Sequence, residues 1–519
     1  MPSSQMGDRA NGEWEAEPRV IPADEHNRRL VANVHPAAWD NPRAQSRYHL
    51  VVIGAGTGGL VTAAIAAALG ARVALIERNL MGGDCLNVGC VPSKAMIRGA
   101  RAWTAAAEAA ERFGAPATEG RGDFGRVMER MRRIRADISV HDSAARFRDL
   151  GVDVYLGEAL LSGPDTVRVD GQTLRFRRAV IAAGSRPAEL PIPGLADAGY
   201  LTNETVFSLT ELPRRLAVIG GGPIGCELAQ SFARFGSRVT LLEAGERILA
   251  NDDAEAAALV AKALRHDGVE IVCGATIAAV EAGRGRHSIV YTGSASSGSV
   301  EVDRILVAAG RRPNVEGLGL EMAQVQYDSK SGIDVDDRLR TSNPRIFAIG
   351  DIASPFQFTH VADAHARMVV RNALFFGRAR ASDLVIPWVT YTSPELAHVG
   401  IPPDAVARLP EEIDIVTVPV SAVDRARLDG EDEGFLKVYV KKKSDEILGA
   451  TLVAEHAGET ISQITQAMNQ DIGLGKLSES IYPYPTSSEV VRKASDQWNR
   501  GRLTPLAMNA FNTFFRLLR

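Results

Sequence analysis

The chain has 519 residues, of which 45% are hydrophobic and 24% are charged, and its formal net charge is −4. This is the composition of a globular protein that is too long for one hydrophobic core, so we expect several domains. The negative charge, without a face rich in lysine or arginine, argues against a nucleic-acid partner.

The number of cysteines and the hydropathy of the chain indicate the compartment in which the protein is expected to function. The four cysteines, Cys85, Cys90, Cys226 and Cys273, are too few for a secreted disulfide scaffold. Cys226 falls in a predicted helix and Cys273 in a predicted strand, and we expect both to be small buried residues. No apolar run reaches the roughly 18 residues of a membrane span, and the start of the chain lacks a secretory signal. A cytoplasmic protein is expected.

Residues 1–46 are predicted to form an N-terminal extension, partly disordered, with a short helix around Glu25–Val34. The first domain begins with the apolar run Tyr48–Ile53, which is typical of a strand buried on both faces of a parallel sheet. A glycine-rich turn, an alanine-rich helix to Leu69 and a second strand ending in Glu77 follow. Such a turn lets the backbone approach a pyrophosphate at a helix N-terminus, and the acid accepts hydrogen bonds from a ribose.

The segment after this unit reads Gly-Gly-Asp-Cys-Leu-Asn-Val-Gly-Cys-Val-Pro-Ser-Lys, from Gly82 to Lys94. Cys85 and Cys90, beside glycines and ahead of a helical run, are placed to close a small ring. A helix start lowers the pKa of a cysteine thiol. The pattern favours a disulfide that opens and closes during turnover, and the alternatives are a structural disulfide or two buried thiols.

The strand–turn–helix–strand pattern recurs, from Leu216 to Glu243. Two such turns, each with its acid, predict two nucleotide-binding domains, whereas the alternative is that the glycines serve only helix–strand packing. The carboxylate of Glu243 repels a 2′-phosphate, and Ala244 and Ala250 supply no arginine there, so NADH is favoured over NADPH. Arg247 keeps NADPH open.

Further strands are predicted within 179–184, 305–310 and 346–351. From Val385 onward short alternating segments mix with helices, which predicts an α+β domain with an antiparallel sheet. A helix is expected in 503–519, with Thr504 as its cap and apolar groups over much of its surface. It docks either on protein, including a second subunit, or on a membrane surface.

Residues 48–497 resemble the class I pyridine nucleotide–disulfide oxidoreductases, the family of dihydrolipoamide dehydrogenase, glutathione reductase and mercuric reductase. The resemblance implies an α/β fold with two Rossmann-like domains, for FAD and NAD, and a C-terminal α+β dimerisation domain. The implied parts are the N-terminal extension 1–46, an FAD-binding domain of 47–189 and 311–384, an NAD-binding domain of 190–310, a dimerisation domain of 385–500 and an amphipathic tail of 501–519.

The resemblance also implies residue roles. Cys90 matches the thiol beside the flavin, Cys85 the thiol that meets the substrate, Lys94 the lysine near the flavin and Glu227 its acidic partner. The matched FAD-binding positions are Gly54, Gly56, Gly59, Glu77, Gly83, Asp84, Lys94, Ala159, Gly184, Ser185, Asp351 and Ala362. The matched NAD-binding positions are Gly220, Gly222, Ile224, Gly225, Glu243 and Gly310.

The chain departs from the family near its C-terminus. A His-Pro-Thr pattern followed by a glutamate is expected, but here Tyr484 precedes Pro485 and Thr486, with Glu489 in place. A histidine with a pKa near 6.5 exchanges protons at neutral pH, whereas a tyrosine with a pKa near 10 is a poor base. Mercuric reductase is similar in having tyrosine here, although this chain has no cysteine after Cys273 to deliver a metal.

We therefore expect an enzyme in which NAD(P)H reduces FAD and FAD reduces the Cys85–Cys90 disulfide. The acceptor is a small-molecule or protein disulfide, or a soft thiol-bound metal ion. The resemblance implies a homodimer with a shared active site, and no resident metal is predicted. Two alternatives remain: a dihydrolipoamide dehydrogenase, and a redox-responsive flavoprotein recruited to a membrane or partner by its C-terminal helix.

Overall fold

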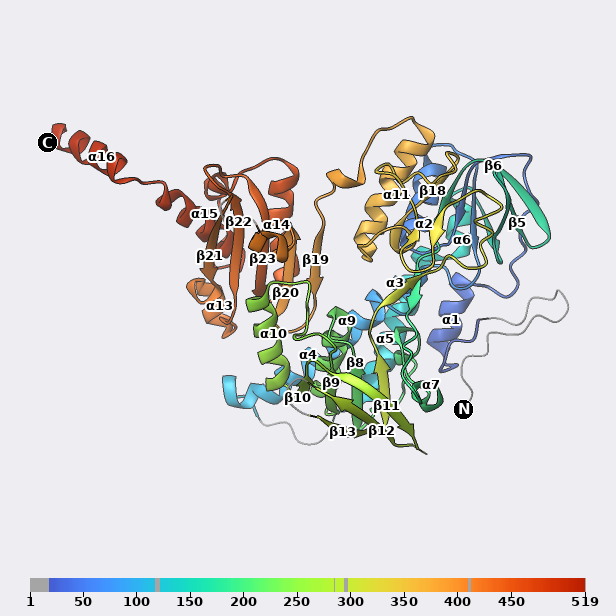
Figure 1. The fold of residues 1–519 in the computed structure, drawn as a ribbon, viewed down its shortest axis with the longest axis horizontal. Helices are drawn as coiled ribbons and strands as arrows, with labels where there is room; N and C mark the ends of the chain where they lie inside the picture. Colours follow the sequence, from blue (N-terminus) through green and yellow to red (C-terminus); the bar gives the residue numbers. More distant parts are fainter. Residues whose placement is uncertain (1–17, 117–121, 284, 294–296, 409–411, 519) are drawn as a thin grey trace. The chain divides into compact units, whose positions relative to one another are not determined.

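The computed structural model describes residues 18–116, 122–283, 285–293, 297–408 and 412–518. The chain forms two compact units, coloured by sequence in Figure 1. Unit 1 comprises Met1–Gly220, Ser231–Leu242 and Thr276–Leu384, and unit 2 comprises Gly221–Gln230, Glu243–Ala275 and Val385–Arg519.

The main sheet of unit 1 has seven strands in the order β3-β2-β1-β6-β5-β4, and β18 also pairs with β6. Strands β1, β2, β3, β6 and β18 are parallel to their neighbours, whereas β4, β5 and β6 form antiparallel pairs. The strands are β1 (Tyr48–Ile53), β2 (Val73–Glu77), β3 (Val152–Leu156), β4 (Leu160–Gly163), β5 (Thr166–Val169), β6 (Gln172–Ile181) and β18 (Ile346–Ala348). Five of the six residues of β1 are buried, which confirms the predicted central strand.

Helices of unit 1 pack around this sheet and place the cysteine segment. They are α1 (Glu25–Val34), α2 (Thr57–Ala68), α3 (Gly83–Asn87), α4 (Cys90–Phe113), α5 (Phe124–Ile138), α6 (Ala144–Asp149) and α11 (Thr359–Leu374). The predicted helix in the N-terminal extension is confirmed, and the side chain of Asp24 caps it. The predicted disorder of the extension falls partly on residues 1–17, which lie outside the described residues.

The second strand–turn–helix–strand pattern is also confirmed. Parallel strands β14 (Arg304–Val307), β8 (Arg215–Ile219) and β9 (Arg238–Leu242) lie side by side, and α9 (Pro223–Arg234) connects β8 to β9. The antiparallel strands β11 (Thr276–Ala282), β12 (His287–Thr292) and β13 (Ser297–Val302) follow in the chain. Short pairs complete unit 1: β7 (Ser185–Pro187) with β15 (Arg311–Pro313), and β16 (Tyr327–Asp328) with β17 (Gly332–Ile333).

Unit 2 contains the predicted antiparallel sheet, whose strand order is β19-β20-β23-β22-β21. The strands are β19 (Pro387–Thr390), β20 (Glu395–Gly400), β21 (Ile413–Pro419), β22 (Phe435–Lys441) and β23 (Ile447–Ala454). Valine, leucine and alanine from the sheet pack against α14 (Ala457–Asn469) and α15 (Glu489–Gly501) in one core. The unit also contains α10 (Ala254–His266), β10 (Val269–Val272), α12 (Pro403–Arg408) and α13 (Asp424–Asp429).

The predicted C-terminal helix is α16 (Pro505–Leu517), at the red end of the chain in Figure 1. Thr504 caps it by accepting a hydrogen bond from the amide of Ala507 at 3.2 Å, and Pro505 occupies its first turn. None of its residues is buried, and Leu506, Phe514 and Phe515 are exposed. Among the described residues, no helix combines the length and the apolar character that crossing a bilayer requires.

Candidate active site

Cys85 and Cys90 lie on two consecutive helices joined by a two-residue turn. Cys85 sits within the short helix α3, and Cys90 is the first residue of the 24-residue helix α4. The turn must come close to α3, because a Cβ on Gly89 would lie 2.7 Å from the carbonyl oxygen of Asp84. Glycine at this position thus lets the chain fold back, so that both sulfur atoms face the same region.

The two cysteines differ in their electrostatic surroundings. Cys90, at the start of α4, lies where the helix dipole favours a thiolate. Its Sγ is 3.3 Å from the hydroxyl of Thr359, the first residue of α11, so two helix N-termini meet at this sulfur. A hydrogen bond with Cys90, followed by burial, raises the pKa of the Cys85 thiol.

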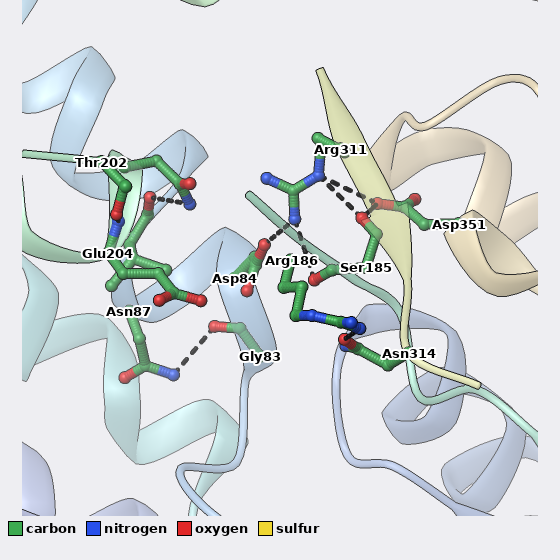
Figure 2. Close-up of polar contacts among 12 residues, drawn as sticks. Gly83, Asp84, Asn87, Ser185, Arg186, Thr202, Glu204, Arg311, Asn314 and Asp351 are labelled. Carbon is green, nitrogen blue, oxygen red and sulfur yellow. Dashed lines mark hydrogen bonds and ion pairs between the residues drawn. The ribbon is translucent and has the colours of Figure 1, made fainter. Parts of the chain in front are cut away.

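The side chain of Asn87 stabilises the loop between the cysteines by hydrogen bonds to nearby backbone carbonyls. Its side-chain amide donates to the carbonyl oxygens of Met81 at 3.1 Å and Gly83 at 2.9 Å, and the second contact is drawn in Figure 2. Both carbonyls belong to the turn that enters α3, so the side chain ties the end of α3 back to its beginning. The carbonyl of Val88 accepts a hydrogen bond from Asn203 at 3.3 Å.

Arg311, which we did not predict as a site residue, connects three segments next to the cysteines. Figure 2 shows its guanidinium between Asp84, Ser185 and Asp351. Ser185 donates to Asp351 at 2.6 Å, and burial raises the pKa of the Asp351 carboxyl. Asp84 immediately precedes Cys85, so this polar cluster joins β7, β15 and Asp351 to the cysteine loop. The only signal for Arg311 in the sequence was its place directly after Gly310.

The first glycine turn has the geometry that a dinucleotide requires. Gly54 has φ +98° and a Cβ there would lie 2.5 Å from the carbonyl of Ala182, whereas a Cβ on Gly59 would lie 1.8 Å from that of Gly54. Gly56 caps α2 without a side-chain bond, which leaves amide groups at the helix start for a phosphate. Glu77 accepts hydrogen bonds from the amide of Ala55 at 2.7 Å, and burial raises its pKa. These residues fit FAD.

The second glycine turn fits a pyridine nucleotide. Glu243 accepts hydrogen bonds from the amides of Gly221 at 2.5 Å and Gly245 at 2.6 Å, which places the carboxylate beside the turn. A Cβ on Gly222 would meet no atom within 4 Å, so the backbone there is open to a ligand. Arg247 donates to the carbonyls of Leu249 at 2.6 Å and of Ala250 and Asp252 at 2.8 Å. The guanidinium is thus occupied by the backbone.

The remaining predicted nucleotide-binding residues have varied surroundings. Gly83 approaches the Cα of Gly56, and a Cβ on Gly58 would lie 3.6 Å from Ala362, so the first turn, α3 and α11 come together. Gly184, Gly220 and Gly310 have positive φ angles of +67°, +110° and +81°. Ala159 packs beside the core of the main sheet, and Ile224, in the first turn of α9, is exposed, with Gly225 next to it.

Lys94 lines a cavity of about 410 Å³ that opens beside Cys90. Arg98 and Arg130 also line it, with Ile134 and Ile138, and no lining residue among those described is acidic. The predicted partner Glu227 belongs to unit 2, where it is buried and accepts a hydrogen bond from the amide of Tyr391 at 2.9 Å. The pairing of Lys94 with Glu227 stays a prediction.

Tyr484 and Glu489 each have their own partner within unit 2. The Tyr484 side chain is 72% exposed, and its hydroxyl donates to Asp424 at 3.1 Å, which raises the pKa of the phenol. Glu489 is 6% exposed and accepts a hydrogen bond from Arg492 at 2.5 Å. The Tyr484 phenol is therefore no proton acceptor near neutral pH.

The other two cysteines belong to unit 2. Cys226 is buried in α9, as predicted, and burial raises the pKa of its thiol. Cys273 follows the end of β10 and is only half-buried, because the chain leaves the strand at that residue, which corrects the expectation of a fully buried side chain.

The glycine turns, the paired thiols and the antiparallel C-terminal sheet together define a flavoprotein disulfide reductase. The chain belongs to the pyridine nucleotide-disulphide oxidoreductase family, whose profile matches residues 48–366, and the dimerisation domain of that family matches residues 386–495. It is therefore an FAD-dependent oxidoreductase that uses NAD(P)H, and its fold combines two Rossmann-like domains with an α+β dimerisation domain.

Similar proteins carry different activities within this class. Mercuric reductase of Staphylococcus aureus is 33% identical over 448 residues, which cover 86% of this chain and 82% of the relative. Dihydrolipoyl dehydrogenase of Geobacillus stearothermophilus is 34% identical over 453 residues, covering 86% of this chain and 95% of the relative. A Cu(II) complex of the HOCl-induced flavoprotein disulfide reductase RclA from Escherichia coli superposes with a TM-score of 0.76 at 29% identity, covering 86% of this chain and 98% of that one.

Proposed function

We propose that the enzyme uses NADH to reduce a soft metal ion held by thiolates, through a redox-active pair formed by Cys85 and Cys90. Bound FAD supplies the two-electron connection between the nicotinamide and this pair. The observation that carries the proposal is the pairing of Cys85 with Cys90, whose sulfur atom lies at two helix N-termini. In addition, a tyrosine takes the place of the expected histidine, and its hydroxyl donates a hydrogen bond to Asp424.

The two thiolates supply the electrons for the second half of the reaction. When they close to a disulfide they release two electrons, which convert one divalent mercuric ion to neutral metal, or two cupric ions to cuprous ions. Thiolate sulfur is a soft ligand that suits such ions. No proton is delivered to a leaving thiol in this step, so the reaction tolerates the loss of the histidine. Similarity to mercuric reductases and to a Cu(II)-complexed reductase supports this acceptor class.

The charges around the cavity beside Cys90 favour a negatively charged acceptor. Lys94, Arg98 and Arg130 line it, and Arg98 and Arg130 are exposed. A metal ion carried by thiols that bear carboxylates is anionic as a complex, and basic side chains attract it more strongly than a neutral complex. The cavity therefore supports anionic thiol complexes as the form in which the metal arrives.

The test is a comparison of acceptors under anaerobic conditions. NADH oxidation is followed with Hg(II) in excess glutathione, with Hg(II) in excess of the neutral thiol 2-mercaptoethanol, and with lipoamide. We expect metal-dependent oxidation that is faster with glutathione and is lost in Cys85→Ser and Cys90→Ser but kept in Cys273→Ser. Unchanged metal reduction in the two serine variants would contradict the proposal.

The second candidate is a dihydrolipoamide dehydrogenase, which the similarity to dihydrolipoyl dehydrogenases favours. The same acceptor comparison separates the two. Turnover with lipoamide well above turnover with any metal complex establishes the dehydrogenase and overturns the metal proposal.

The dimerisation domain supports a homodimer in which residues of one protomer complete the site of the other. In such a dimer Tyr484 and Glu489 of one protomer lie near the cysteines of its partner. Sedimentation equilibrium gives the oligomeric state directly. A monomer with full activity would rule out the shared site.

The exposed apolar surface of α16 favours, as a second role, recruitment to an anionic membrane surface. Residues 502–519 contain three arginines and no acid. Leu506, Phe514 and Leu517 expose 82%, 54% and 81% of their surface. An amphipathic helix with these features binds anionic headgroups and buries its aromatic side chains at the interface.

Co-sedimentation with vesicles tests this role. We expect the full chain, but not a chain ending at Gly501, to bind phosphatidylglycerol vesicles and to leave phosphatidylcholine vesicles largely unbound. Equal behaviour of the two chains contradicts recruitment, and a change of oligomeric state on truncation would instead assign α16 to the contact between copies.

A further inference from the structure

A buried arginine connects the cysteine loop to the N-terminal extension. Nη1 of Arg135, on α5, donates to the carbonyl oxygen of Asn87 at 2.6 Å, within the loop between Cys85 and Cys90. Nη2 of the same side chain donates to Oδ1 of Asn27, on α1, at 2.6 Å. Arg135 is 3% exposed and Asn27 is 1% exposed, so water does not replace either bond.

The extension is anchored on both sides of this contact. The side-chain amide of Asn27 donates to the carbonyl of Pro22 at 2.7 Å, and Arg132 of α5 forms an ion pair with Asp24, the cap of α1. Asn33, further along α1, donates to the hydroxyl of Ser139 at 2.8 Å. The segment 18–46 thus enters the domain as an ordered part of it.

Apolar packing brings the same segment to the cysteine loop. Leu30 and Val34 of α1 are fully buried, in one cluster with Met81 and Leu86, the residue next to Cys85. The amide of Met81 also donates to the carbonyl of Val34 at 3.2 Å. The cysteine loop therefore packs against side chains of residues that precede β1.

The residues of the segment 18–46 that make these contacts lie outside the part of the chain that matches the family, which begins at residue 48. We propose that the segment 18–46 is a strap that positions the Cys85–Cys90 loop, with Asn27 and Arg135 as positioning residues that set its thiol–disulfide equilibrium. The inference deepens the proposed function, because it rests on the redox pairing of these two cysteines.

The position of the fixed carbonyl links the strap to the thiol–disulfide equilibrium. Asn87 lies between Cys85 and Cys90 in the chain, and its carbonyl oxygen is fixed by a buried guanidinium. Closing the disulfide ring requires a defined geometry of this loop. A loop that is no longer held by Arg135 therefore closes with a different equilibrium constant.

Loss of the Asn27 side chain acts mainly on one buried charged group, the guanidinium of Arg135. Nε of Arg135 has no hydrogen-bond partner among the described residues, and burial lowers the pKa of the guanidinium to about 10. Removal of the Asn27 oxygen leaves a second buried donor unpaired, so the arginine shifts and releases the Asn87 carbonyl.

The experiment measures the equilibrium directly, without NADH. Holoenzyme is incubated in mixtures of reduced and oxidised dithiothreitol, in which one dithiothreitol disulfide forms for each protein disulfide reduced, and the free thiols are trapped with a maleimide. We expect Asn27→Ala to shift the equilibrium constant about tenfold, the size of one lost charge-assisted hydrogen bond.

Two variants separate positioning from loss of structure. Asn33→Ala removes a side-chain hydrogen bond from the same helix, one donated to Ser139 instead of accepted from Arg135, and is expected to leave the constant within about twofold of wild type. Asn27→Asp keeps an oxygen for Arg135 and is expected to recover most of the shift. FAD absorbance and the unfolding temperature verify that each variant is folded.

The outcomes separate the inference from the proposed function. A wild-type protein that forms no Cys85–Cys90 disulfide in any mixture overturns the proposed redox pair. A normal disulfide in wild type with an unchanged constant in Asn27→Ala overturns the strap alone, and an equal shift in Asn33→Ala overturns the assignment of Asn27 and Arg135 as its positioning residues.

Discussion

The hydroxyl of Thr359 lies 3.3 Å from Sγ of Cys90, so that the first residue of α11 contacts the first residue of α4. Neither residue caps its own helix. The capping positions of α4 and α11 are Gly89 and Phe358, and neither makes a side-chain hydrogen bond to its helix. Their contact places one sulfur atom at two positive helix ends, and a hydroxyl is there to donate a hydrogen bond to a thiolate.

Replacement of Thr359 by valine should weaken this thiolate. Valine keeps the shape of threonine but has no hydroxyl, so a hydrogen bond to a charged sulfur, worth about 1.5–3 kcal/mol, is lost. In a Cys85→Ser background, we expect iodoacetamide to alkylate Cys90 about tenfold more slowly at pH 7. Thr359→Ser keeps the hydroxyl and serves as the control. Equal rates in the valine and serine variants would show that the hydroxyl does not stabilise the thiolate.

Glu243 should decide between NADH and NADPH. Its carboxylate is held beside the second glycine turn by the amides of Gly221 and Gly245, and Arg247 is occupied by carbonyl oxygens. Removing the negative charge in Glu243→Gln should raise kcat/KM for NADPH relative to NADH about tenfold, because the repulsion of a 2′-phosphate disappears. Glu246→Gln, an exposed acid close by in the chain, is the control. An unchanged ratio in Glu243→Gln would place the specificity elsewhere.

The local patterns of the sequence were enough to predict much of the fold. Each nucleotide unit has its strand, glycine turn, helix and acid within a short stretch, and Tyr48–Ile53 and Arg215–Ile219 form the strands expected from their apolar runs. The capped helix at Thr504 was also predictable, because a cap and a proline in the first turn are local signals.

The hydrogen bonds and ion pairs between residues far apart in the sequence had no local pattern from which they could be predicted. Arg135 meets Asn27 across 108 positions and Arg311 meets Asp84 across 227, and arginines are too common for a pattern to single these out. The different positions of Cys85 and Cys90 were equally hidden, since they depend on which residue begins the long helix. Sequence reasoning identified the reactive pair but not the groups that hold and tune it.

The stability of the dimerisation domain should depend on the neutrality of His398. The side chain is fully buried, with Nε2 donating to the carbonyl of Ile401 at 2.9 Å and Nδ1 accepting from the hydroxyl of Thr451 at 2.8 Å. Burial lowers its pKa from 6.5 to about 4. Between pH 6.5 and about 4 the unfolded chain binds a proton that the folded chain does not, so the free energy of unfolding decreases as the pH is lowered.

The contribution of His398 amounts to about 3 kcal/mol, fully present above pH 6.5 and lost as the pH falls to about 4. Urea unfolding at pH 7, 5.5 and 4.5 measures it as the difference between wild type and His398→Gln, which should shrink as the pH falls. His456→Gln, at an exposed histidine, should show no such trend. A difference that stays constant with pH would mean that His398 is not buried in its neutral form.

Tyr484→His should create activity toward disulfide substrates. In the native chain the phenol donates to Asp424 and has a raised pKa, so it does not accept a proton from a thiol at neutral pH. An imidazole with a pKa near 6.5 does, and general acid–base catalysis of this kind is worth at least about a hundredfold when the group is well placed. We expect lipoamide turnover in Tyr484→His to rise at least about tenfold, with a bell-shaped pH profile, while metal reduction changes little. Tyr484→Phe, which removes the hydroxyl without adding a base, should show no gain. A rise of the same size in Tyr484→Phe would mean that the tyrosine blocks access to the cysteines rather than failing as a base.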